Sequence, residues 1–132
     1  AFRKALSRGF DDALLLNDFD QVAEVTSANI FWVRKKLLYT PPLSAGCLDG
    51  VTRNAVIAVA KRLGIRVVER NESLASVAKA DEVFICSSLK LVIGVAQIAH
   101  GNRRWTFRAG DMTELIQSYF RAMVDVDDPL SR

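Results

Sequence analysis

Cysteine, histidine and proline are scarce in this chain of 132 residues, and each shortage excludes a class of protein. Two cysteines and one histidine cannot build a disulfide framework, nor can they supply the ligands of a structural zinc site, so we expect no metal site. Three prolines and seven glycines are too few for a collagen-like chain. Because the cysteines do not form a Cys-x-x-Cys pair, we expect a reducing, cytoplasmic setting.

Long apolar runs and a dominant charge are also missing. The longest apolar stretches, such as residues 91–99, are far shorter than the roughly 20 residues that cross a bilayer, so we expect no membrane partner. Eighteen Lys and Arg against 15 Asp and Glu give a net charge of +3, and the basic residues are scattered. Because nucleic-acid sites usually need a clustered basic stripe, the sequence favours no nucleic-acid partner.

What the chain does contain is typical of a single globular domain. Half of its residues are apolar and a quarter are charged, and no Gly/Ser/Pro-rich linker or internal repeat divides it. Apolar periodicity predicts a mixed α/β fold. The expected helices are 1–8, 51–63, 73–79 and 113–124, and the expected strands are 13–16, 29–34, 37–39, 65–69, 82–86 and 91–98.

A glycine turn that opens directly into a helix is the most informative segment, Leu48-Asp49-Gly50-Val51-Thr52-Arg53. The free N–H groups and positive dipole of a helix start can bind phosphate, and the Thr52 hydroxyl adds a donor. Such turns also occur in α/β connections without a ligand, so the local residues leave both readings open. A second polar turn, Ser87-Ser88, follows an expected strand, and strand ends often hold ligands in α/β folds.

Glu24 is a carboxylate set among apolar residues, where we expect it to be at least half buried. A buried carboxylate needs a cation or a donor, so an ion pair with an arginine and a role in ligand binding both remain open. Asn29 precedes an apolar strand and by itself indicates a turn or bulge residue.

Five segments form an informative ordered set. They are GFDDAL at 9–14, VAEVTSANIF at 22–31, LYTPPL at 38–43, GCLDGVTR at 46–53 and ADEVF at 80–84. Taken together, these segments resemble the class IV aminotransferases, over about residues 9–98. That family comprises fold-type IV pyridoxal-phosphate enzymes: branched-chain aminotransferases, D-amino-acid aminotransferases and 4-amino-4-deoxychorismate lyases.

The resemblance implies a fold and a cofactor. The fold would be the C-terminal, large domain of a fold-type IV enzyme, a barrel-like mixed sheet with outer helices, and the cofactor pyridoxal 5'-phosphate. It would place Glu24 against the pyridine nitrogen, Asn29 in support of that loop, Leu48 on the cofactor ring, Gly50, Val51 and Thr52 at the phosphate, and Ser88 as a second phosphate-side hydroxyl. Arg53 would support the helix start through its own ion pairs.

The resemblance also implies what this chain leaves out. The family's Schiff-base lysine would lie upstream of Ala1, and Lys4 is out of register, so residues 1–132 would hold no catalytic residue and lack the N-terminal domain. The chain, which also lacks an initiator methionine, would be inactive alone and would bind the cofactor weakly or not at all.

The complete protein, a homodimer, would transaminate an amino acid through Schiff-base chemistry, in amino-acid metabolism. Two alternatives remain. The first is a 4-amino-4-deoxychorismate lyase acting on an amino-chorismate-like substrate, since the run at 87–90 is more similar to the lyase-like members of the family. The second is a non-catalytic domain that binds phosphate or the cofactor.

Overall fold

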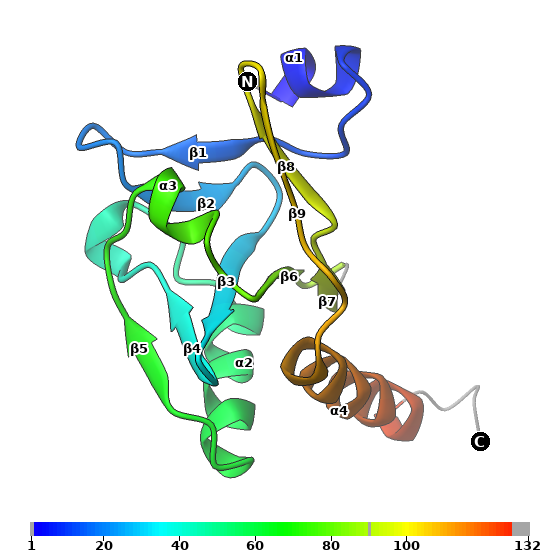
Figure 1. The fold of residues 1–132 in the computed structure, drawn as a ribbon. Coiled ribbons are helices and arrows are strands. Elements are labelled where there is room, and N and C mark those ends of the chain that lie inside the picture. The colour runs from blue at the N-terminus through cyan, green and yellow to red at the C-terminus, as the bar shows by residue number, and fades with distance from the viewer. Residues whose placement is uncertain (1, 90, 128–132) are drawn as a thin grey trace.

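The computed structural model describes residues 2–89 and 91–127, and Figure 1 shows their arrangement. The helices are α1 (Phe2–Ser7), α2 (Val51–Arg62), α3 (Leu74–Val77) and α4 (Asp111–Asp127), with a short 3-10 helix η1 (Leu43–Ala45). The strands are β1 (Leu14–Leu16), β2 (Val22–Val25), β3 (Asn29–Arg34), β4 (Leu37–Thr40), β5 (Val67–Glu69), β6 (Glu82–Ser87), β7 (Leu91–Gly94), β8 (Gln97–His100) and β9 (Arg103–Thr106). No helix in this part of the chain is long and apolar enough to cross a bilayer.

The strands form one central sheet and two small ones. The central sheet has the order β5-β4-β3-β6-β7, in which β4 and β5 run parallel and the other neighbours run antiparallel. β1 pairs with β2 and β8 pairs with β9 in separate two-stranded sheets. The expected mixed α/β class is confirmed, but the described strands lie in three sheets rather than in one closed barrel.

The central strand β3 is buried on both faces, because its successive side chains enter two different apolar clusters. Phe31 and Val33 pack with α2 and α4 on one face, and the Phe31 ring stacks on Phe84 with 5.1 Å between centroids. Ile30 and Trp32 pack on the other face with residues of β2 and α3. This burial explains why the sequence shows a continuous apolar run here rather than an alternating one.

The expected strand at 91–98 is wrong in one respect, since the structure breaks it in two. β7 ends at Gly94, and β8 begins at Gln97. Val95 still donates its N–H to the carbonyl oxygen of Val83, at 2.8 Å, before the chain turns away. Apolar residues continue across the break, so periodicity could not reveal it. β9 was not predicted, because a strand with largely exposed residues lacks the apolar signal that marks a buried one.

The last helix begins two residues earlier than predicted, at Asp111, and the side chain that caps it comes from a strand. Glu82 accepts a hydrogen bond from the backbone N–H of Thr113, at 2.8 Å. A side chain at Gly110 would collide with the Glu82 carboxylate, so this glycine lets the strand residue reach the helix start. Ile116 and Phe120 of α4 are buried.

Candidate functional site

Most of the predicted site residues gather at one edge of the central sheet. β3 begins there with Asn29, and the antiparallel neighbours β4 and β6 end there. The loop that leaves β4 runs back across this edge and leads into α2 at Gly50. Ser88 follows the last residue of β6, and Cys86 of that strand pairs with Asn29. The topology therefore brings residues from distant parts of the sequence to one place.

The backbone of Leu48 is held between two of the predicted residues. Its N–H donates to Glu24 Oε2 at 3.3 Å, and its carbonyl oxygen accepts from Asn29 Nδ2 at 3.0 Å. Asn29 is buried, whereas the Leu48 side chain is 72% exposed. The sequence alone does not predict this link, because the three residues lie on three separate segments. It makes the position of the Glu24 carboxylate depend on the loop before α2.

A glycine suits position 50 because a neighbouring side chain lies very close to it, and not because of its backbone angles. Its φ of −74° and ψ of 144° are open to any residue. A Cβ at this position, however, would lie 2.7 Å from Asn29 Oδ1, closer than real contacts allow. Asn29 therefore lies so close to the backbone of Gly50 that a larger residue would require its amide to move.

The start of α2 presents free backbone donors. The first N–H groups of an α-helix have no intrahelical partner, and at Gly50 no side chain caps them. The first turn carries no acidic residue, and the side chain of Val51 is 82% exposed. The positive end of the helix dipole is thus open, which favours an anion such as a phosphate ester. Thr52 lies in this turn and is partly buried.

Ser88 occupies an exposed turn between β6 and β7. The turn begins at the same sheet edge as Asn29. Within residues 2–89 and 91–127, no hydrogen bond joins Ser88 to the residues that precede α2. Its predicted role at the phosphate therefore stays a prediction.

Arg53 forms an ion pair that supports the helix start, as the family resemblance implies. Its Nη2 lies 2.6 Å from Glu69 Oε1, and the arginine side chain is almost fully buried. Glu24, by contrast, forms no ion pair with an arginine among the described residues. Its only hydrogen bond in that part of the chain comes from the Leu48 N–H.

Both cysteines, Cys47 and Cys86, are free, buried thiols. Burial raises the pKa of Cys86 to about 12. Burial also raises the pKa of Cys47, where the nearby Arg53 charge acts in the opposite direction. No group of three or more His, Cys, Asp or Glu side chains in the described part of the chain could hold a metal ion.

Comparison with known proteins adds to this geometry. A family model described as amino-transferase class IV matches residues 1–98. The chain is 38% identical over 112 residues to the mitochondrial branched-chain-amino-acid aminotransferase 1 of Arabidopsis thaliana, covering 83% of this chain and 29% of that protein.

Solved structures agree with this similarity. The branched-chain amino acid aminotransferase of Thermobaculum terrenum in its pyridoxal-phosphate form superposes with a TM-score of 0.87 at 33% identity, covering 100% of this chain and 43% of that one. A 4-amino-4-deoxychorismate lyase assigned in Legionella pneumophila gives 0.85 at 29% identity, over 92% and 44% of the two chains. The chain spans less than half the length of each of these three relatives.

Proposed function

Because the chain belongs to the class IV aminotransferase family, we propose that it forms the cofactor-binding, C-terminal domain of a branched-chain amino acid aminotransferase. One observation carries this proposal: the Leu48 backbone joins a carboxylate, Glu24, to an uncapped helix start at Gly50. Those are the two polar features needed to hold the two ends of pyridoxal phosphate. The branched-chain aminotransferases among the relatives support the substrate class.

The residues present fit pyridoxal phosphate. The N–H groups of the first turn of α2 would bind its phosphate, with the Thr52 hydroxyl beside them. Glu24 would keep a proton on the pyridine nitrogen, and the exposed Leu48 side chain offers an apolar surface for the ring. When bound, the cofactor supplies a ring that accepts electrons from the substrate α-carbon, and a protonated pyridine nitrogen strengthens that capacity.

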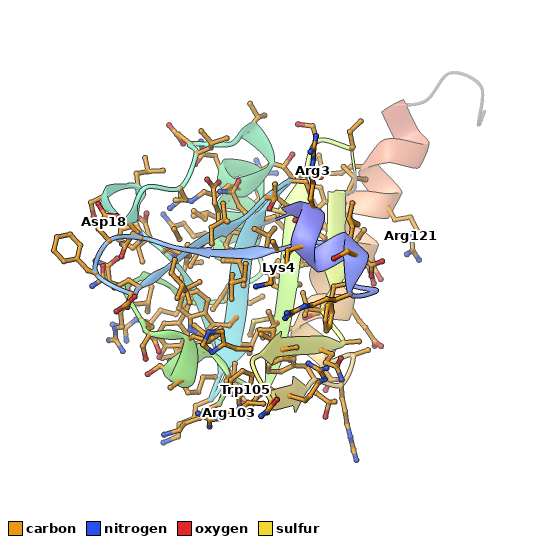
Figure 2. All side chains as sticks on the ribbon, turned by 90° about the horizontal axis from the view of Figure 1, so that it is seen from above. Arg3, Lys4, Asp18, Arg103, Trp105 and Arg121 are labelled. Carbon is orange, nitrogen blue, oxygen red and sulfur yellow. The ribbon has the colours of Figure 1, made fainter. Side chains whose placement is uncertain are left out.

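We also propose that the lysine that carries the cofactor is not among residues 1–132. Figure 2 labels Lys4 on α1, where its side chain is exposed. An exposed lysine on a six-residue helix lacks the buried, positioned surroundings that a cofactor-bearing lysine needs. The other half of the active site would come from an N-terminal domain, and the complete protein would be a homodimer in the cytoplasm.

Titration of this chain with pyridoxal phosphate tests the cofactor site. We expect weak but saturable binding that is tighter than for pyridoxal, which lacks the phosphate. Borohydride reduction followed by peptide mass mapping should then show no stoichiometric lysine adduct. Equal affinity for the two compounds would disprove the phosphate site, and a single stoichiometric adduct at Lys4 would disprove the upstream lysine.

A lyase is the second candidate function, favoured by the Legionella structure and by the polar run after β6. Two chimeras, which place the N-terminal part of the Thermobaculum aminotransferase or of the Legionella lyase before Ala1, separate the two where both show the same activity. Transfer of an amino group from leucine to a 2-oxo acid would support the aminotransferase. Release of product from 4-amino-4-deoxychorismate without a 2-oxo acid would support the lyase.

A further inference from the structure

Arg53 is unusual because it begins on the first turn of α2 and yet is buried. Its side chain is 3% exposed. Nη2 donates to the carbonyl oxygen of Pro41 at 3.1 Å and to Glu69 Oε1 at 2.6 Å, and Nη1 donates to Asn54 Oδ1 at 3.3 Å. Pro41 follows β4 and Glu69 ends β5. This one side chain therefore ties the start of α2 to the ends of two strands of the central sheet.

The two members of the ion pair between Arg53 and Glu69 differ in their exposure to water. Glu69 is 51% exposed, so water screens its negative charge far more than it screens the buried guanidinium. The Nε of Arg53 is also buried, and no hydrogen-bond acceptor meets it in the described part of the chain. An incompletely neutralised positive charge consequently lies beside a helix start whose own dipole is positive.

The Arg53 charge also affects the pKa of a neighbouring thiol. Cys47 precedes the loop that leads into α2, and the Arg53 charge acts to lower the pKa of that thiol against the effect of burial. The guanidinium charge thus acts on a residue of the loop before α2, where the carboxylates of Glu24 and Glu69 oppose it.

We propose that Arg53 is a positioning residue for phosphate binding, which it promotes by fixing the first turn of α2 and by adding positive charge beneath it. The inference rests on the proposed function. Arg53 acts indirectly, through the helix start, because its own hydrogen bonds go to protein atoms. Glu69 tunes the effect, because it partly neutralises the charge.

Two substitutions separate this role from a purely structural one. Arg53→Met removes the charge, and Glu69→Gln removes only its neutralisation, while its side-chain oxygen still accepts a hydrogen bond. If Arg53 merely held the fold, both substitutions would weaken ligand binding. If its charge promotes phosphate binding, Arg53→Met weakens and Glu69→Gln strengthens it.

The measurement is the affinity of the chain for pyridoxal phosphate divided by its affinity for pyridoxal, from isothermal titration calorimetry. This ratio isolates the phosphate, since damage to the ring end affects both ligands. We expect Arg53→Met to lower the ratio about tenfold and Glu69→Gln to raise it. Arg62→Met removes the same charge from an exposed position in the last turn of α2, and should change the ratio less than about twofold.

Folding of each variant is checked by its urea unfolding midpoint. Should Arg53→Met fail to fold, Arg53→Lys keeps a charge but loses the planar fork, and should lower the ratio by a smaller factor. A wild-type chain that does not prefer pyridoxal phosphate overturns the proposed function and this inference with it. A wild-type preference that the Arg53 variants leave unchanged, or that both Arg53→Met and Glu69→Gln lower, overturns the inference alone.

Discussion

At the scale of single residues, the contact between Asn29 and Gly50 determines the shape of the candidate site. The sequence predicted Gly50 from its place before a helix, and the family resemblance singled out Asn29. Neither showed that the two residues touch, because 20 positions separate them and only the folded sheet brings them together. Local patterns identify residue types that suit a ligand, whereas contacts such as this one depend on topology.

Gly50→Ala should disturb this contact directly. The new Cβ would lie 2.7 Å from Asn29 Oδ1, so the amide must move and release the carbonyl oxygen of Leu48. We expect a loss of about 1–3 kcal/mol in the free energy of unfolding, together with weaker pyridoxal-phosphate binding. Urea unfolding and calorimetry measure the two effects.

Gly94→Ala is the matched control, because a Cβ there meets only Thr113 Cγ2, at 3.8 Å. That variant should unfold within about 0.5 kcal/mol of the wild type and bind the cofactor normally. Equal behaviour of the two alanine variants would show that the tight approach at Gly50 is not real.

At the scale of elements, the helices were easier to predict than their ends. The periodicity of α2 and α4 located both helices, since each has an apolar face that packs on the central sheet. The cap of α4 could not be predicted in this way. Thr113, in the first turn, donates to Glu82, which is 31 residues away in the sequence.

Glu82→Gln should therefore destabilise the chain. The change removes a negative charge from the positive end of α4 and should lower the free energy of unfolding by about 1 kcal/mol. Glu114→Gln provides the comparison, because it removes the same charge from an exposed position in the same turn. Urea unfolding of both variants is the measurement, and equal losses would show that the contact from Glu82 adds nothing to a general charge effect.

At the scale of the whole molecule, the mixed α/β class followed from the order of apolar segments. The division into three sheets did not, because an apolar run continues across the break between β7 and β8. Exposed strands such as β9 leave little trace in the sequence. The central sheet was predictable because burial dictates its residues, and Cys86 in its strand β6 belongs to that buried core.

The buried Cys86 thiol links global stability to pH. Its pKa rises from 9.0 to about 12 on folding, so between those values the unfolded chain loses a proton that the folded chain keeps. The stabilisation is complete below pH 9 and declines as the pH rises toward 12. Cys86→Ala removes this pH-dependent contribution to stability and leaves a small cavity. Its stability relative to wild type should improve by about 1 kcal/mol between pH 8.5 and 10 in urea unfolding, whereas parallel pH profiles would show that the thiol ionises alike in both states.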